Sequence, residues 1–383
     1  MKLLLTADTL GGVWTYCMEL CAGLKPYGVE IALATLGRRL SKRQRAEVAA
    51  LDHVRLYESD YKLCWMPDPW ADVERSTRWL KALEKEVKPD ILHLNDLGLG
   101  NAAWRAPMLL GAHSCVCSWW RAVKGEPAPA PEWDRYRMQV WVTCQHADLI
   151  VAPSQAMLAA LEQNNGRLPE SRVIYNGREF PALPATPSDA APEKQPLFFS
   201  AGRIWDEAKN IASLARIAPR LPWPVYVAGE TQTPDGTDGG NLTGVRSLGP
   251  LEPDALADWL QKASVYVMPA RYEPFGLSIL EAARAGCALV LGDIPSLREI
   301  WGDAARYVHP DDDEQLTRTL QELADDPVQR AQLAQQAQDR ARRYSREQMA
   351  AEYWAAYRHL QEMRAAQKAR PEISQHSHLL FTG

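Results

Sequence analysis

Two carboxylates eight residues apart, Glu273 and Glu281, lie where a buried strand is followed by a helix. The apolar run 265–268 predicts the strand, and the helix-forming run after Gly276 ends at Gly286. Backbone amides at a helix start are unpaired donors at the positive end of the dipole, which suits phosphate. Carboxylates instead accept hydrogen bonds from hydroxyl groups. The stretch favours a sugar nucleotide, with phosphates in its middle and hydroxyls at both ends, although chance explains the Glu spacing alone equally well.

The same segment resembles a known enzyme signature. Residues 273–286 read Glu-Pro-Phe-Gly-Leu, then Leu-Glu-Ala, then a closing Gly, which resembles retaining nucleotide-sugar glycosyltransferases of family 4. The resemblance covers nearly the whole chain and implies the GT-B fold, in which two Rossmann-like α/β/α domains face each other across a cleft. It implies that Glu273 acts in catalysis by holding sugar hydroxyls and that Glu281 binds the ribose of the donor. The other donor-binding residues implied here are Pro274, Phe275, Gly276, Leu277 and Ser278.

Two cations, Arg203 and Lys209, flank the loop that follows the apolar strand 197–201. At the carboxyl end of a parallel strand they could neutralise a diphosphate, Arg as a planar fork and Lys as a point charge. Surface salt bridges usually explain such a pair, but the Gly-Arg…Lys-Asn spacing resembles the diphosphate clamp of the family. The resemblance therefore implies that both cations are catalytic. It also implies that the turn containing Gly249 and Leu251 holds the base of the donor.

A second strand, glycine turn and helix begin the chain, where strand 2–7 precedes Gly11, Gly12 and the helical run 13–24. The Gly-x-Gly-x-x-Gly fingerprint is absent, which disfavours a nicotinamide enzyme. An ordinary tight turn is the simpler explanation, but the resemblance implies that Gly12 faces the donor and Gly11 the acceptor. His113 resembles the strand-end His that lies near the transferred sugar in the family, which implies a catalytic role. A lone strand-end His is more often structural.

Tryptophans are concentrated in the first part of the chain, where nine of the fourteen lie within 141 positions. Aromatic faces bind sugars, but most of these residues are expected to pack in the core or on the surface. Trp119 is the acceptor-binding candidate. It lies in residues 115–132, a segment with several prolines that we expect to be a long loop over the cleft.

Composition and periodicity divide the chain into five parts, and the resemblance implies the role of each domain. Residues 1–178 are expected to form an acceptor-side Rossmann-like domain, and the proline-rich stretch 179–196 has the composition of a linker. Residues 197–348 are expected to form the nucleotide-sugar-binding domain. Helix 349–367 is expected to cross back to the first domain, as the last helix does in the GT-B fold. Residues 368–383 have no periodicity and are expected to be a weakly ordered tail.

The overall composition is that of an ordinary globular chain, with 383 residues, 46% of them hydrophobic and 24% charged. The formal net charge of −5 argues against a nucleic-acid partner. The seven Cys are scattered and are expected to be reduced. Asp311, Asp312 and Asp313 are expected to start a helix rather than to hold a metal. The resemblance implies no metal and no cofactor, with the nucleoside-diphosphate sugar as co-substrate.

No apolar run approaches the length needed to span a bilayer, and Asp8 ends the apolar start of the chain too early for a signal peptide. A cytoplasmic location is therefore expected. A basic run heading a helix nonetheless has the charge to contact anionic headgroups, as in family members that act on lipids. A solvated helix face is the alternative and is favoured because one face has few apolar residues. The five cations are Arg38, Arg39, Lys42, Arg43 and Arg45.

The expected function is transfer of a sugar from a nucleoside-diphosphate sugar, UDP being the commoner donor class, to a hydroxyl acceptor. The resemblance implies that the anomeric configuration is retained, by front-face attack assisted by the departing phosphate. Two alternatives stay open. One is a nucleotide-sugar 2-epimerase, and the other is a catalytically silent protein that binds sugar nucleotides. The sequence identifies neither the sugar, nor the base, nor the acceptor, which is a saccharide, a lipid or a small molecule.

Overall fold

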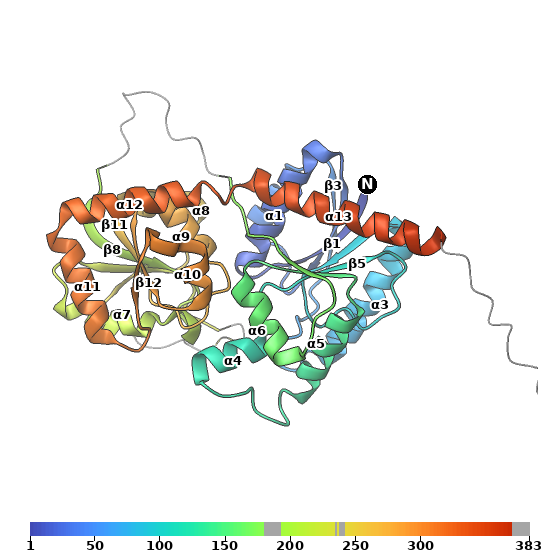
Figure 1. Cartoon of the computed structure of the whole chain (residues 1–383), viewed down its shortest axis with the longest axis horizontal. Helices are drawn as coiled ribbons and strands as arrows, with labels where there is room; N and C mark the ends of the chain where they lie inside the picture. Colours follow the sequence, from blue (N-terminus) through green and yellow to red (C-terminus); the bar gives the residue numbers. More distant parts are fainter. Residues whose placement is uncertain (180–192, 234–235, 237–241, 370–383) are drawn as a thin grey trace, which may run out of the picture.

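Two α/β domains, each built on its own parallel sheet, make up the computed structural model of the chain (Figure 1). The structure describes residues 1–179, 193–233, 236 and 242–369. Within these residues the first sheet has the order β3-β2-β1-β4-β5-β6-β7 and the second the order β10-β9-β8-β11-β12-β13. The strands of the first are β1 (Lys2–Asp8), β2 (Glu30–Leu36), β3 (Val54–Glu58), β4 (Ile91–Leu94), β5 (Met108–Gly111), β6 (Leu149–Ala152) and β7 (Ser171–Val173). Those of the second are β8 (Gln195–Ala201), β9 (Val225–Ala228), β10 (Arg246–Ser247), β11 (Ala263–Met268), β12 (Ala288–Gly292) and β13 (Arg306–Val308).

Helices cover both faces of each sheet, as expected where parallel strands are joined by helical crossovers. The first domain carries α1 (Gly12–Leu24), α2 (Lys42–Ala49), α3 (Trp70–Val87), α4 (Val116–Lys124), α5 (Asp134–His146) and α6 (Gln155–Asn165). The second carries α7 (Ile211–Ile217), α8 (Pro253–Lys262), α9 (Leu277–Arg284), α10 (Pro295–Trp301), α11 (Asp313–Asp325) and α12 (Pro327–Ala341). The last helix is α13 (Arg346–Ala369).

The central strands are mostly apolar because successive side chains enter cores on opposite sides of the sheet, whereas the edge strand β10 is exposed. In β1, Leu3 and Leu5 belong to the core under α1 and α13, whereas Leu4 belongs to the core on the other face. In β8, the side chains of Phe199 and Phe198 likewise enter two different cores, one on each face of the second sheet. The central strands are fixed because they are packed on both faces of the sheet. The loops at their carboxyl ends therefore start from fixed positions.

The last helix crosses from the second domain to the first, which confirms this part of the predicted fold (Figure 1). It begins with a serine cap, since Ser345 Oγ accepts a hydrogen bond from Gln348 N at 3.1 Å. Its apolar face packs on α1, and Gly23 lies so close to Ala350 that a side chain at Gly23 would overlap it. Tyr353 is buried in the same core. The first domain is therefore completed by a helix from the end of the chain.

Several predicted boundaries differ from the observed ones. The segment 115–132 is not a loop throughout, because it contains α4, whose end is set by Gly125 in the left-handed conformation with φ 73°. The prolines follow only after that glycine. Strand β8 starts at Gln195, inside the predicted linker, because it pairs with Ala263 of β11 there. The predicted linker residues 180–192 and tail residues 370–383 lie outside the described residues.

Candidate functional site

Two loops are predicted to bind the donor and are called the donor loops below. They meet because β8 and β11 are neighbours in the second sheet. The loops that follow these strands are residues 202–210 and 269–276, and Arg271 N donates a hydrogen bond to Ala208 O at 2.8 Å. The pairing brings Lys209 Nζ into an ion pair with Glu273, and both side chains are 13% exposed. Ligands bind at such a sheet edge in open α/β folds. The structure thus unites two residues that are far apart in the sequence and were assigned to one site.

Arg203 lies at the start of the loop 202–210 and forms an ion pair within it. Its Nη2 lies 2.9 Å from Asp206 Oδ2, and the Asp206 side chain is only 5% exposed. The pKa of Asp206 is lowered although burial alone would raise it, because Arg203 and Lys209 stabilise the carboxylate. Asp206 was not among the predicted site residues. Its position three residues after Arg203 was a signal that could have identified it.

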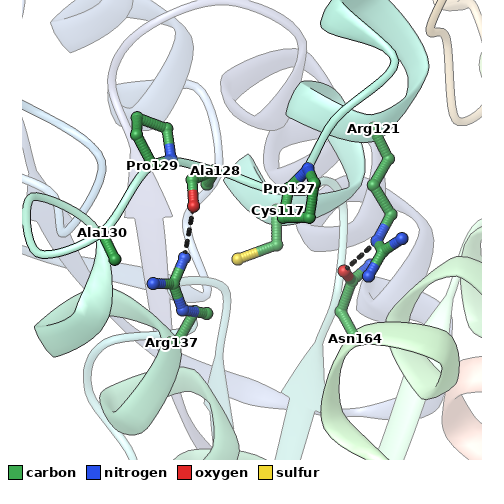
Figure 2. A pocket seen from close by; sticks show the side chains of 8 residues that line it. All are labelled: Cys117, Arg121, Pro127, Ala128, Pro129, Ala130, Arg137 and Asn164. Atoms are coloured by element: carbon green, nitrogen blue, oxygen red, sulfur yellow. Dashed lines mark hydrogen bonds between the residues drawn. The ribbon is translucent and has the colours of Figure 1, made fainter.

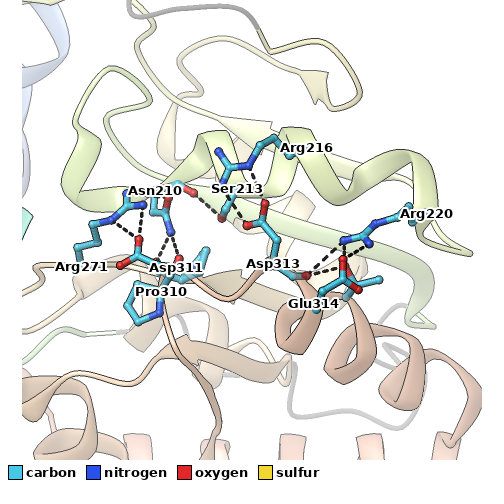
Figure 3. Close-up of polar contacts among 11 residues, drawn as sticks. Asn210, Ser213, Arg216, Arg220, Arg271, Pro310, Asp311, Asp313 and Glu314 are labelled. Atoms are coloured by element: carbon cyan, nitrogen blue, oxygen red, sulfur yellow. Dashed lines mark hydrogen bonds and ion pairs between the residues drawn. The ribbon is translucent and has the colours of Figure 1, made fainter.

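Asn210, the residue after Lys209, forms hydrogen bonds with Arg271 and Pro310 (Figure 3). It is a non-glycine residue with φ 56°, and it is 2% exposed. Its Nδ2 donates to Pro269 O at 3.0 Å and to Pro310 O at 2.7 Å, while its Oδ1 accepts from Arg271 Nη1 at 2.8 Å. These three bonds offset the cost of the left-handed backbone. Asn210 therefore ties both donor loops to the segment before α11.

The acidic run before α11 has the structure of a helix start. Asp312 Oδ1 accepts a hydrogen bond from Gln315 N at 2.8 Å and caps the helix. Its two neighbours form ion pairs, Asp311 with Arg271 at 2.7 Å and Asp313 with Arg216 at 2.7 Å (Figure 3).

The start of α9 contains most of the predicted donor-binding residues. Gly276 has φ 91° and precedes the first helical residue, Leu277. Pro274 O accepts from Ser154 Oγ of the first domain at 2.7 Å. Phe275 is buried, and its amide faces Glu273 Oε1 at 3.4 Å, so this amide is not the fully free donor that we expected.

Two further predicted donor residues lie deeper in α9. Ser278 Oγ accepts from Tyr266 OH at 2.9 Å, which ties the helix to β11. The carboxylate of Glu281 is paired with the guanidinium of Arg178, and the two side chains are 11% and 24% exposed. Arg178 follows the last strand of the first domain and also lies 3.7 Å from Glu19. Arg178 was missed because nothing in its local sequence indicates a partner in the other domain.

The turn predicted to hold the base closes against the end of β9. Gly249 O accepts from Gly229 N at 2.8 Å. Gly229 has φ 144°, and a side chain there would overlap the backbone of Gly202. Leu251 is half-buried beside the core of the second domain. The turn is therefore adjacent to the loop that carries Arg203.

The glycine turn of the first domain faces the donor loops. A Cβ at Gly11 would lie 3.5 Å from Arg203 Nη1, and a Cβ at Gly12 would lie 3.6 Å from Leu277 Cδ1. Gly11 has φ 72°, which favours glycine. Asp8, just before the turn, is buried, and this burial raises its pKa to about 7. The structure thus brings Gly11 and Gly12 to Arg203 and Leu277.

His113 lies two residues after the end of β5. Its ring packs against Tyr16 of α1 with centroids 4.4 Å apart. Its Nε2 lies 2.8 Å from Asn95 Oδ1. Burial lowers the pKa of His113 to about 4, so the imidazole is neutral over the ordinary working range of pH.

Trp119 lies on α4 and contacts the second domain. Its Nε1 donates to Asp206 Oδ1 at 3.0 Å, and Lys124 at the end of the same helix pairs with Glu207 at 2.6 Å. The residue predicted to touch the acceptor is therefore hydrogen-bonded to the partner of Arg203.

A cavity of about 370 Å³ lies behind α4 (Figure 2). The residues Cys117 and Arg121 line it from the helix face opposite Trp119, as their spacing of four requires. Arg121 Nε donates to Asn164 Oδ1 at 2.9 Å, and Arg137 Nη1 donates to Ala128 O at 2.6 Å. The cavity is thus separated from the donor loops by the helix itself.

The basic run has acidic partners nearby. Arg39 pairs with Asp60 at 3.3 Å, Arg43 with Glu252 at 2.9 Å, and Arg45 with Glu58. These pairs reduce the free positive charge available to a headgroup, so membrane contact stays a prediction. Among the described helices, none is both long enough and apolar enough to span a bilayer.

Two family models together match most of the chain. The model of Glycosyltransferase Family 4 matches residues 10–179, and that of Glycosyl transferases group 1 matches residues 195–326. A glycogen synthase of Mycobacterium tuberculosis is 26% identical over 273 residues, which are 67% of this chain and 65% of that protein. The match therefore spans less than two thirds of that relative.

Solved structures share the fold. Sucrose-phosphate synthase of Thermosynechococcus elongatus superimposes with a TM-score of 0.77 at 19% identity, covering 96% of this chain and all of that one. HepE of Anabaena, solved with UDP-glucose, gives 0.68 at 17% identity, covering 96% and 100%. These likenesses confirm the predicted GT-B fold. The chain belongs to family 4 of the glycosyltransferases.

Proposed function

We propose that this chain is a retaining glycosyltransferase that moves a sugar from a UDP-sugar to a hydroxyl group of an acceptor. The observation that carries the proposal is the meeting of Arg203, Lys209 and Glu273 at the adjacent ends of β8 and β11. Gly11 of the other domain lies opposite Arg203, so acceptor and donor sides face each other. The UDP-glucose bound by HepE supports UDP as the nucleotide.

In the proposed reaction the bond between the anomeric carbon and the β-phosphate oxygen breaks. An acceptor oxygen bonds to the same face of that carbon, and its proton passes to the departing phosphate oxygen. Arg203 and Lys209 stabilise the charge of the diphosphate, and Glu273 holds sugar hydroxyls beside the positive oxocarbenium-like centre. These two side-chain cations supply the positive charge at the phosphates in a metal-independent reaction.

The first experiment identifies the donor and the reaction. Nucleotide sugars are ranked by the thermal shift that they produce, since a ligand of the native state raises stability. The best donor is then followed by NMR with and without a panel of alcohols, saccharides and lipids. The proposal expects a product that keeps the donor's anomeric configuration and requires an acceptor. An epimer formed without acceptor would indicate an epimerase, and binding without any reaction would indicate a silent binding protein.

The second experiment tests the diphosphate clamp. Arg203→Ala and Lys209→Ala should each lower kcat by about 10²–10³, the cost of removing one donor to a developing negative charge. Arg216→Ala is the matched control, because Arg216 is an exposed arginine of the same domain that pairs with Asp313. Turnover within a few-fold of the parent in both clamp variants, with donor binding intact, would contradict the assignment.

A further inference from the structure

A polar cluster lies at the carboxyl ends of β4 and β5, which are neighbours in the first sheet. It joins His93 on β4, Asn95 just after β4 and His113 just after β5. The cluster reaches the last helix, because His93 Nδ1 lies 2.8 Å from Tyr357 OH. Of these residues only His113 was assigned to the reaction. Asn95 is its direct hydrogen-bond partner, at 2.8 Å from Nε2.

The orientation of the Asn95 amide follows from its other partner. Its Nδ2 lies 2.7 Å from the main-chain oxygen of Thr6, and its own backbone N donates to Thr6 Oγ1 at 2.8 Å. A main-chain carbonyl can only accept, so the amide nitrogen must face Thr6 and the amide oxygen must face His113. The oxygen can only accept as well. His113 Nε2 therefore carries the hydrogen.

Gly111 keeps the space for this contact. A Cβ at Gly111 would overlap Asn95 Oδ1, and it would lie 3.0 Å from His113 Nε2 and 3.2 Å from His93 Nε2. The backbone of β5 at this position is ordinary strand, so crowding and not φ requires glycine. A substitution there would displace the Asn95 oxygen without removing it.

The remaining ring nitrogen of His113 has one role left. In the neutral ring with hydrogen on Nε2, Nδ1 has a lone pair and can only accept. Nδ1 is buried and has no hydrogen-bond partner among the described residues. A buried polar atom without a partner requires an explanation, and a group supplied by a ligand is one. A neutral ring also adds no positive charge beside a centre that itself becomes positive.

We propose that Asn95 is a positioning residue that holds His113 as the Nε2–H tautomer, so that Nδ1 accepts a hydrogen bond from a hydroxyl of the transferred sugar. This inference rests on the proposed function for the identity of the ligand. The tautomer itself depends only on the protein. Asn95 acts through His113 and does not touch the donor.

The tautomer can be measured on the unmodified protein. The full chain is labelled with ¹⁵N-histidine, and long-range ¹H–¹⁵N correlation spectra distinguish the protonated ring nitrogen from the unprotonated one. His113→Gln identifies which signals belong to His113. The expected pattern has hydrogen on Nε2 and none on Nδ1 of His113. Hydrogen on Nδ1 would overturn the proposal whether or not any transfer activity is found.

A double-mutant cycle tests the effect on the reaction. Asn95→Ala and Gly111→Ala should each lower kcat roughly tenfold or more through misplacement of His113, with the Kd for UDP unchanged. If Asn95 acts through His113, adding Asn95→Ala to His113→Gln should cost little more. Fully additive losses would overturn the positioning role. Asn164→Ala is the matched control, since Asn164 lies at the cavity behind α4.

Discussion

Each charged side chain predicted to touch the donor has a partner of opposite charge in the protein. Lys209 pairs with Glu273, Arg203 with Asp206, and Glu281 with Arg178. A bound diphosphate would compete with carboxylates for the two cations, and donor hydroxyls would compete with Arg178 for Glu281. These ion pairs hold the charged side chains in place before the donor binds. Each partly buried charge keeps a partner of opposite charge and so is not left unpaired away from water.

The two glutamates should respond differently to two ligands. Glu281→Gln should weaken binding of both UDP and the sugar nucleotide, because the predicted contact is with ribose. Glu273→Gln should weaken only the sugar nucleotide, because its predicted contact is with the sugar. A lost hydrogen bond to a charged group costs about 1.5–3 kcal/mol, or roughly ten- to a hundredfold in Kd. Titration calorimetry with UDP and UDP-glucose measures both effects.

The control for these variants is Glu314→Gln, an exposed glutamate that pairs with Arg220 and belongs to neither donor loop. Equal losses for both ligands in Glu273→Gln would show that Glu273 contacts the nucleotide and not the sugar.

Asp8 should make the stability of the protein depend on pH. Burial raises the pKa of Asp8 from 3.8 to about 7, so between these values the native state holds a proton that the unfolded chain has released. The contribution of protonated Asp8 to the free energy of unfolding is therefore full below pH 3.8, and it is lost as the pH rises through about 7. The stability of the parent minus that of Asp8→Asn should fall over this range in denaturant titrations. A pH-independent difference would show that Asp8 titrates normally.

At the scale of elements, the site consists of loops whose neighbours are chosen by strand order. The order β1-β4-β5 brings the glycine turn, Asn95 and His113 together, and the order β8-β11 brings Lys209 to Glu273. Helix α4 then connects the two sets, because Trp119 donates to Asp206 while Asp206 holds Arg203. Helix α4 is thus linked by one hydrogen bond to the carboxylate that pairs with Arg203.

Two substitutions of Trp119 separate a hydrogen-bonding role from an acceptor platform. Trp119→Phe keeps an aromatic face and removes the Nε1–H group, so it should lower kcat/KM up to about tenfold if the bond to Asp206 matters. Trp119→Ala should add a large rise in the acceptor KM only if the ring also binds acceptor. Steady-state kinetics with UDP binding measured in parallel decides between them. Trp120→Phe on the same helix is the control, and full activity of Trp119→Phe would contradict the coupling.

At the scale of the whole molecule, the described parts of the two domains are in direct contact. Glu299 of α10 accepts hydrogen bonds from Gln155 N at 2.7 Å and Ala156 N at 2.9 Å, and so it caps α6 of the other domain. Its Oε1 also accepts from Tyr175 OH at 3.0 Å. Beside it, Ser154 donates to Pro274 O in the donor loop. These bonds favour a closed arrangement in which the donor loops face the acceptor domain.

Removing this contact should shift the protein towards an open state. Glu299→Ala leaves two helix amides and one hydroxyl without their acceptor, at a cost of about 0.5–2 kcal/mol for the lost cap. Small-angle X-ray scattering should show a larger radius of gyration, and UDP-glucose should partly restore the smaller one. Glu322→Ala in α11 is the control. An unchanged radius in Glu299→Ala would show that other contacts hold the domains closed.

Sequence reasoning predicted the fold correctly and located the loops that follow β8 and β11, because both depend on local patterns. Apolar runs with glycine turns mark parallel strands and the loops after them, and the run 273–286 carries its own signature. It misread residues 115–132, since prolines and tryptophans suggested a loop where Gly125 allows a helix to form and end first. The roles of all the predicted site residues in binding and catalysis stay predictions, those of Glu281, Gly249 and Leu251 included.

The sequence by itself determined which loops carry charge, glycine and histidine, because those are properties of residue type and near neighbours. Only the tertiary structure decided which residues distant in the sequence become their partners. Trp119 and Asp206 are 87 positions apart, and Gln155 and Glu299 are 144 apart, so no local pattern links them. Strand order and domain contact set these pairs, because hydrogen bonds and ion pairs act over a few ångströms of space and not along the chain.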